Sequence, residues 1–159
     1  MAAQATRATA ALTRLGITFR VHVYDHDPRA DGYGTEAVER LGLDPDRTFK
    51  TLLVGAGPQL LVAVVPVSAL LDLKALAAAA GTKSLAMADP AAAERATGYV
   101  VGGISPIAQQ RRLPTFVDSS AADFATIYCS AGRRGLEVEL SPDDLCRATD
   151  ATLAHIARR

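Results

Sequence analysis

The chain has 159 residues, 49% of them hydrophobic, and its 17 basic and 17 acidic side chains cancel to a net charge of zero. This length suits one domain, and the apolar content suffices for one packed core, which excludes a largely disordered protein. A neutral chain has no bulk positive field to hold nucleic acid, so any RNA contact is expected to be local, and no DNA partner is expected.

Cysteine usage and hydropathy indicate the compartment. Cys129 and Cys146 are too few for a disulfide framework, and the N-terminal segment lacks the charged stretch and long apolar run of a secretory signal. The longest apolar stretches, Leu60 to Val67 and Leu76 to Ala80, are far too short to span a bilayer. We therefore expect a cytoplasmic protein with no membrane role.

The first third of the chain predicts two helices and a strand. Apolar residues recur at helical spacing from Thr6 to Leu15, and a glycine follows as a stop. Phe19 to Tyr24 alternates apolar and polar residues, which is typical of a half-buried strand. Asp25 to Gly34 is predicted to be a polar connection, and Thr35 to Leu41 a short helix.

The middle of the chain predicts a hairpin and two more helices. Phe49 to Val54 and Gln59 to Pro66 are apolar runs on either side of a turn from Gly55 to Pro58. Asp72 to Ala80 is rich in alanine and predicts a helix, and the Asp-Pro pair that opens Asp89 to Ala96 predicts another.

The last third predicts short strands from Thr115 to Asp118, Thr126 to Ser130 and Leu136 to Leu140. Ser141 and Pro142 open a helix whose spacing continues to Ala157. Several connections between strands are too short for crossover helices, which favours a mixed sheet over a doubly wound parallel one. No repeat or linker divides the chain, so residues 1–159 are expected to form a single α/β (α+β) domain around a curved mixed sheet.

The most informative segment runs from Gly98 to Asp118, GYVVGGISPIAQQRRLPTFVD, where a short apolar strand breaks into two glycines and a proline. Gly102 and Gly103 carry no Cβ to hold a ligand away, and Pro106 fixes one φ angle. Backbone N–H groups of such a loop can stabilise an oxyanion. The glycines alone are equally compatible with an ordinary connection between strands.

Lys50 begins an apolar strand and therefore emerges beside the core. Its ammonium either reaches solvent over its aliphatic stem or lies beside a bound ester or phosphate, where it could polarise a carbonyl. Position alone leaves both interpretations open.

Other reactive side chains form no known catalytic or metal pattern. His22 and His26 are four residues apart, but no third ligand follows at a zinc spacing, so no required metal is expected. Ser105 lacks the strand-to-helix elbow of a serine hydrolase. Cys129 lies in a predicted strand and is interpreted as a small buried hydrophobe rather than a nucleophile.

Several separated motifs together resemble the YbaK/EbsC family of Cys-tRNA(Pro) deacylases. They are Tyr24 to Pro28 (YDHDP), Phe49 to Val54 (FKTLLV), Gly98 to Asp118, Phe124 to Tyr128 and Gly132 to Gly135. They follow the family's order and spacing over nearly the entire chain. This family is a free-standing relative of the editing domain inserted in some bacterial prolyl-tRNA synthetases. The resemblance implies a curved mixed sheet or partly open barrel surrounded by helices, and an enzyme that clears cysteine wrongly attached to tRNA(Pro).

The resemblance also implies site residues. The family's essential lysine falls on Lys50, its tyrosine on Tyr24, its serine on Ser130, and its G-x-x-x-P loop on Gly102, Gly103, Ile104, Ser105 and Pro106. Its acidic residue falls on Glu137, where this chain has glutamate in place of the family's aspartate. The longer side chain reaches about one methylene further, enough to disturb a close hydrogen bond.

The mechanism implied by the resemblance uses no dedicated protein nucleophile and no cofactor. The thiol of the mischarged cysteine attacks its own ester carbonyl, which is fast if the pocket holds the reactive conformer. On this hypothesis the roles divide as follows: the amides of Gly102 and Gly103 stabilise the oxyanion, Lys50 and Tyr24 hold the ribose and ester, and Ser130 and Glu137 orient the amino group.

The expected partners are mischarged Cys-tRNA(Pro) and prolyl-tRNA synthetase, with Cys-tRNA(Cys) as a second substrate to test. Four arginines could track tRNA phosphates, although paired arginines often only solvate a turn: Arg111, Arg112, Arg133 and Arg134. Zero net charge favours weak binding to tRNA alone and recruitment by the synthetase. Two alternatives stay open, an Ala-tRNA(Pro) deacylase and a non-catalytic adaptor that binds the synthetase or the aminoacylated end.

Overall fold

The computed structural model describes residues 5–29 and 32–159. Positions 30 and 31, inside the predicted connection 25–34, lie outside the described residues. The α-helices are α1 (Arg7–Arg14), α2 (Tyr33–Leu41), α3 (Leu73–Ala80), α4 (Pro90–Thr97) and α5 (Pro142–Thr149), with a short 3₁₀ helix η2 (Ser119–Asp123). Within the described residues, no helix is long and apolar enough to cross a membrane.

The strands of the described residues form three sheets, of which the largest is mixed and the other two are antiparallel. They are β1 (Arg20–Val23), β2 (Phe49–Ala56), β3 (Gln59–Pro66), β4 (Leu70–Leu71), β5 (Ala86–Met87), β6 (Thr115–Asp118), β7 (Ile127–Arg133), β8 (Leu136–Leu140), β9 (Thr152–Ala154) and β10 (Ala157–Arg158). The largest sheet has the order β5-β2-β3-β6-β9, the second β1-β8-β7, and the third pairs β10 with β4. The expected mixed α+β class is confirmed, without closure into a barrel.

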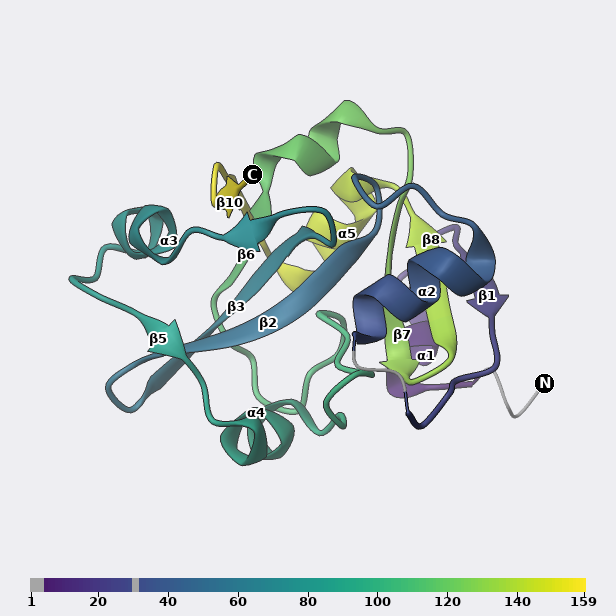
Figure 1. Ribbon diagram of the computed structural model, residues 1–159, viewed down its shortest axis with the longest axis horizontal. Coiled ribbons are helices and arrows are strands. Elements are labelled where there is room, and N and C mark those ends of the chain that lie inside the picture. The colour runs from purple at the N-terminus through teal and green to yellow at the C-terminus, as the bar shows by residue number, and fades with distance from the viewer. Residues whose placement is uncertain (1–4, 30–31) are drawn as a thin grey trace.

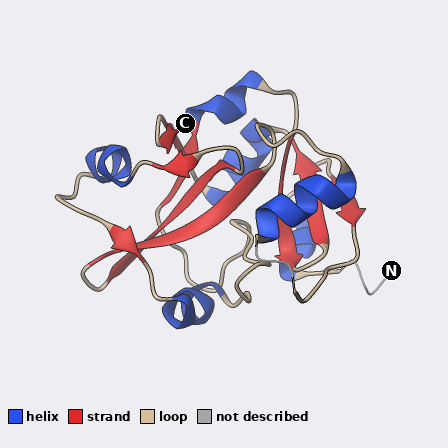
Figure 2. Cartoon of the chain, viewed as in Figure 1, coloured by secondary structure: helices blue, strands red, loops and turns tan. Residues whose placement is uncertain are grey.

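The predicted hairpin forms the centre of the largest sheet. β2 and β3 pair antiparallel from Phe49 opposite Pro66 to Ala56 opposite Gln59, whereas β3 pairs parallel with β6. Figure 1 shows this hairpin crossing the middle of the molecule, with α2 in front of β7 and β8 and α1 behind them. Figure 2 shows that loops rather than strands fill most of the region between β2 and α4.

The two faces of β2 bury their side chains in different clusters. Phe49 and Leu53 belong to the main core with Ile127, Leu136 and Val138, whereas Val54 packs with Leu76 and Ile156. This division follows from the strand period of two, because successive side chains point to opposite faces. A parallel bridge between Thr48 and Tyr128 brings the start of β2 against β7. The two larger sheets therefore meet at this point.

The end of the chain differs from the prediction. The helix that starts after Ser141 stops at Thr149 instead of Ala157, and Asp150 adopts the left-handed conformation with φ 59°. The following residues form β9, parallel to β6, and β10, antiparallel to β4. The Asp118 carboxylate accepts hydrogen bonds from the N–H groups of Ile156 and Ala157, at 2.9 and 2.8 Å. Tertiary pairing of the free sheet edge therefore overrides the helical spacing.

The N-terminal third departs from the prediction in smaller ways. α2 begins at Tyr33, two residues before the predicted start. The alternation in the first strand holds for Phe19 and Val21, which pack against the core, but Val23 is 50% exposed. β1 is an edge strand paired only with β8 among the described residues, and it leaves the core before its last residue.

Candidate active site

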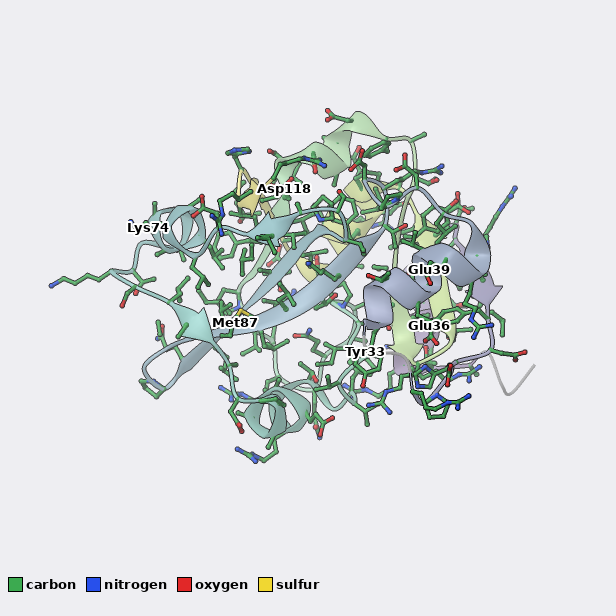
Figure 3. The ribbon with its side chains drawn as sticks, viewed as in Figure 1. Tyr33, Glu36, Glu39, Lys74, Met87 and Asp118 are labelled. Carbon is green, nitrogen blue, oxygen red and sulfur yellow. The ribbon has the colours of Figure 1, made fainter. Side chains whose placement is uncertain are left out.

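A cavity of about 320 Å³ lies along the edge of β2, bounded by the start of α2, the β7–β8 hairpin and residues 98–106, which we call the glycine loop. Five of the residues expected from the sequence line it: Lys50, Gly102, Ile104, Ser130 and Glu137. Figure 3 labels Tyr33 and Glu36 on α2, in front of β7 and β8. The structure thus brings together residues that are up to 87 positions apart in the sequence, from Lys50 to Glu137.

Lys50 lies on β2 opposite Val65 of β3, and its side chain is half-buried at the cavity. Burial lowers the pKa of Lys50 below its ordinary value. Among the described residues no carboxylate lies within salt-bridge distance of its ammonium. The ammonium is therefore free to interact with a ligand in the cavity.

Ser130 and Glu137 face each other across the β7–β8 ladder. Glu137 is only 7% exposed, and burial raises the pKa of its carboxyl to about 8. Over residues 5–29 and 32–159 this carboxyl has no hydrogen-bond partner, so at neutral pH it stays mostly protonated. The Ser130 hydroxyl accepts a hydrogen bond from the Gly132 N–H at 3.2 Å and keeps its own proton to donate.

Tyr24 follows β1 and is not among the residues that line the cavity. Its N–H donates to the Gly135 carbonyl at 3.0 Å, which fixes it beside the β7–β8 hairpin. Burial, and then the charge of Glu137, raise the pKa of Tyr24 to about 12. The phenol is therefore a hydrogen-bond donor at neutral pH, close enough to Glu137 for the two groups to interact.

The two glycines of the loop have different surroundings. The Gly103 N–H already donates to the Val100 carbonyl at 2.9 Å, and a Cβ at Gly103 would stand 2.7 Å from the backbone of Arg133. By contrast, no acceptor among the described residues receives the Gly102 N–H. Gly102, with φ 90°, is thus the loop glycine with an available donor, and Gly103 allows close packing against the hairpin.

The remaining loop residues differ in their access to the cavity. Ile104 lines it, whereas Ser105 is fully buried and its hydroxyl accepts from the Ile107 N–H at 3.1 Å. Pro106 is buried and lines a separate, smaller cavity near the end of α5. Ser105 and Pro106 therefore shape the loop rather than contact the main cavity.

The four arginines are distributed over two segments. Arg134 donates through Nε to the Val101 carbonyl at 2.8 Å and lies 5.1 Å from the centre of the Tyr33 ring, so it touches two lining residues of the cavity. Arg133 is exposed at the same hairpin. Arg111 and Arg112 are exposed beyond the glycine loop, and Arg112 pairs with Asp150 at 3.8 Å.

Residues near the start of α2 were not predicted as part of the site. Tyr33 lines the cavity, and Glu36 accepts hydrogen bonds from His26 Nδ1 at 2.7 Å and from the Asp27 N–H at 2.8 Å. Burial opposes ionisation of Glu36, but these hydrogen bonds outweigh it and lower its pKa. The signal in the sequence is Tyr33 and Glu36 at i, i+3 spacing, which places both on one helix face once the helix starts at Tyr33.

The arrangement of the whole domain is also found in solved structures. The chain superposes with a TM-score of 0.84 on "a putative trans-editing enzyme for prolyl tRNA synthetase", covering 96% of both chains at 21% identity. It superposes with a TM-score of 0.85 on a hypothetical protein of known crystal structure at 25% identity, covering 96% of this chain and 100% of the other. The chain therefore shares the α+β fold of both structures, and its cavity lies between the two larger sheets.

Sequence comparison identifies the family. The sequence model of the aminoacyl-tRNA editing domain matches residues 28–148. The Enterococcus faecalis protein named "Putative Cys-tRNA(Pro)/Cys-tRNA(Cys) deacylase EbsC" is 39% identical over 131 residues, which cover 81% of this chain and 80% of that protein. This chain belongs to the aminoacyl-tRNA editing domain family, and the resemblance to YbaK/EbsC proteins is confirmed.

Proposed function

We propose that this protein is a trans-editing deacylase that removes cysteine from mischarged tRNA(Pro), with Cys-tRNA(Cys) as a second substrate. The observation that carries the proposal is the cavity itself, which gathers a free ammonium, a free amide, a hydroxyl and a carboxyl without an activated protein nucleophile. The 39% identical relative supports the choice of substrate. Translation substrates of this kind place the protein in the cytoplasm.

The cavity lining includes none of Cys129, Ser105, His22 and His26, so none of these candidate nucleophiles is placed to attack a ligand there. Burial raises the pKa of the Cys129 thiol well above its ordinary range, so it stays protonated. The Ser105 hydroxyl is buried, and His22 and His26 are each held by a glutamate, at 2.9 and 2.7 Å. A thiol supplied by the substrate would remove the need for a protein nucleophile.

In the proposed reaction the substrate sulfur attacks the carbonyl carbon of its own ester. A carbon–sulfur bond forms, the carbon–oxygen bond to the ribose breaks, and the thiol proton leaves with the ribose oxygen. Water then opens the resulting thiolactone to free cysteine. The protein contributes orientation and electrostatics, which can supply much of the acceleration of an intramolecular attack.

Each lining group has a proposed task. The Gly102 N–H stabilises the developing oxyanion, and the Lys50 ammonium holds the ester and terminal ribose, with the Tyr24 phenol as a second donor. Ser130 and Glu137 orient the substrate amino group. Gly103 is assigned to loop packing instead of oxyanion binding, because its N–H is bonded to Val100.

Binding to tRNA is proposed to be weak without prolyl-tRNA synthetase. The chain has no net charge, and Arg134, one of the arginines expected to track phosphates, contacts lining residues of the cavity. A neutral protein gains little from long-range steering toward RNA. Recruitment by the synthetase would supply the missing affinity.

The test is a deacylation time course on matched Cys-tRNA(Pro) and Ala-tRNA(Pro), with and without prolyl-tRNA synthetase. The two esters differ only in the thiol, so selective loss of cysteine is the expected result. Loss of alanine at the same rate would contradict the substrate-assisted mechanism and favour the Ala-tRNA(Pro) alternative. Binding without loss of either amino acid would make the protein an adaptor.

A further inference from the structure

One wall of the cavity is an unpaired strand edge. In an antiparallel ladder, residues alternate between those that direct N–H and C=O toward the partner strand and those that direct both away. On β2 the alternation is fixed by three hydrogen bonds. The Thr48 carbonyl accepts from Val67 on the β3 side, whereas the carbonyls of Arg47 and Leu53 accept from Tyr128 and Ala88 on the opposite side.

Thr51 shares the outward phase of Arg47 and Leu53. Its N–H and C=O therefore point away from β3, although Thr51 stands opposite Val64 in the ladder. Among the described residues, β5 pairs along this edge with Val54 and Gly55, and β7 forms a backbone bridge with Thr48, the residue before β2. Between those two contacts lies the cavity, and Thr51 is one of its lining residues.

The outward N–H and C=O of Thr51 have no partner in residues 5–29 and 32–159. The Thr51 hydroxyl is also shielded from solvent and has no hydrogen-bond partner among these residues. Unpaired main-chain groups of a sheet are unusual away from solvent, because an unmade hydrogen bond costs roughly 1–3 kcal/mol. The edge is thus preorganised for a ligand that carries one acceptor and one donor at the spacing of the C=O and N–H of a single residue.

An aminoacyl ester has that spacing. Its carbonyl group and its α-amino group are attached to the same carbon, like the C=O and N–H of one residue in a neighbouring strand. We infer that the main chain of Thr51 pairs with the aminoacyl group of the substrate: the Thr51 N–H donates to the ester carbonyl, and the Thr51 C=O accepts from the α-amino group. This inference rests on the proposed function.

The pairing supplies the second donor that the glycine loop lacks. The Gly103 N–H donates to the Val100 carbonyl, so of the two loop glycines only Gly102 has an N–H available for the substrate. Thr51 and Gly102 line the same cavity from β2 and from the loop. Two amides on one carbonyl oxygen are the usual composition of an oxyanion hole, and loss of one donor commonly costs about 10²- to 10³-fold in rate.

The main chain of Thr51 would bind only groups that every aminoacyl ester has. It holds cysteine and alanine alike and leaves the choice between them to the substrate thiol. A pocket that relied on side-chain fit would gain only about 1–3 kcal/mol per methylene. Strand-like pairing therefore suits an enzyme whose selectivity lies in the attacking group.

The experiment is amide hydrogen exchange by NMR on the unmodified protein. The probe is 3′-deoxy-3′-(cysteinylamino)adenosine, a stable amide analogue of the aminoacylated end. Without it, the Thr51 N–H should exchange rapidly, while the Leu52 N–H, directed into the β2–β3 ladder, should be protected. At saturation, exchange at Thr51 should slow by at least tenfold, and Leu52 should not change.

A backbone variant provides the kinetic test. Replacing the Thr51 N–H by an ester oxygen removes the donor that points away from β3 and keeps the Lys50 carbonyl in the β3 ladder as a weaker acceptor. The variant should retain the native spectrum and lose at least tenfold in kcat/KM for Cys-tRNA(Pro).

The failures can be told apart. Unchanged exchange at Thr51 in a protein saturated with the analogue would overturn the inference, as would full activity of the ester variant, and both leave the proposed deacylase intact. If the native protein neither binds the analogue nor cleaves Cys-tRNA(Pro), the proposed function and this inference fall together.

Discussion

The ring of Tyr33 occupies the place where a side chain at position 102 would begin. A Cβ built on Gly102 would lie 2.6 Å from Cδ1 of Tyr33. α2 and the glycine loop are therefore in direct contact at the cavity, and the absence of a side chain at this position is what permits it. The φ of 90° at Gly102 adds a second reason for glycine.

Gly102→Ala is expected to lower kcat/KM by about 10²-fold, because Tyr33 or the Gly102 N–H must move. Gly57→Ala is the matched control, since Gly57 has φ 61° but nothing within 4 Å of its Cβ position. Both variants should lose roughly 1–2 kcal/mol of stability from the left-handed backbone. Deacylation rates and urea unfolding of the two variants separate strain from active-site damage, and equal activity would refute the assignment of Gly102.

Lys50→Ala should reduce turnover of Cys-tRNA(Pro) on the order of 10²-fold while leaving the unfolding midpoint nearly unchanged, since Lys50 makes no salt bridge within the described residues. Lys74→Ala is the control, because Lys74 is exposed on α3 (Figure 3) and does not line the cavity. Single-turnover rates give the comparison. If the Lys50 variant deacylates Cys-tRNA(Pro) as fast as the Lys74 variant, Lys50 has no catalytic role.

Glu137 should make the protein less stable as pH rises. Burial raises its pKa to about 8, so the folded state binds a proton that the unfolded state releases near its ordinary pKa. The free energy of unfolding should therefore fall as the pH rises from about 5 to 8. Glu137→Gln removes that dependence, and the variant should gain stability over the native protein by a few kcal/mol, on the order of 3, at pH 8 but not at pH 5.

Glu139, two residues further along β8, should affect the pH dependence of stability in the opposite direction. Burial opposes its ionisation, but hydrogen bonds from Thr126 and His22 outweigh this and hold its pKa below the ordinary value. The stabilisation from ionised Glu139 is fully present above the pKa that this carboxyl has in the unfolded state. It is lost as the pH falls through its lower pKa in the folded state. Urea titrations of Glu139→Gln should thus show the greater destabilisation at neutral pH. The same pH trend in both variants would contradict the distinction.

Cys129→Ala should leave deacylation nearly unchanged and cost about 1 kcal/mol in stability, the amount expected for a small buried side chain. The thiol is fully buried, and burial raises its pKa. Native protein treated with iodoacetamide should be modified at the half-buried Cys146 before Cys129, as mass spectrometry would show. Rapid labelling of Cys129, or a large loss of activity in the variant, would mean that a protein thiol takes part.

Arg134→Ala should weaken binding of tRNA and reduce the slope of log K against log salt by about 0.7 to 0.9, as expected for one phosphate contact. It should also loosen Tyr33, over which the guanidinium lies. Arg158→Ala, on exposed β10, is the control. Fluorescence anisotropy with tRNA(Pro) across a salt series measures both effects. If both variants show the same slope of log K against log salt, Arg134 does not contact a tRNA phosphate.

Local patterns in the sequence predict the parts of this fold that are set by local rules. The β2–β3 hairpin follows from a turn between two apolar runs, and Lys50, Gly102 and Ser130 line one cavity. Long-range pairing decides the parts that were missed. β9 and β10 form because β6, β4 and the Asp118 carboxylate offer partners that no local window contains.

The same limit applies within the site. Nothing in the sequence shows that Val100 takes the N–H of Gly103, or that Arg134 lies over Tyr33. Both facts depend on how the loop and the hairpin meet. Sequence patterns therefore identified the glycine pair, and the fold distinguished the two members.

The open edge of β2 also bears on the behaviour of the protein at high concentration. A bare strand edge invites another chain to add a strand and begin aggregation. Here the unpaired stretch is short, because β5 pairs with Val54 and Gly55 and β7 bridges to Thr48, and the glycine loop, α2 and the β7–β8 hairpin border the cavity beside it. The protein can thus keep main-chain groups unpaired for a small molecule without exposing them to its own copies.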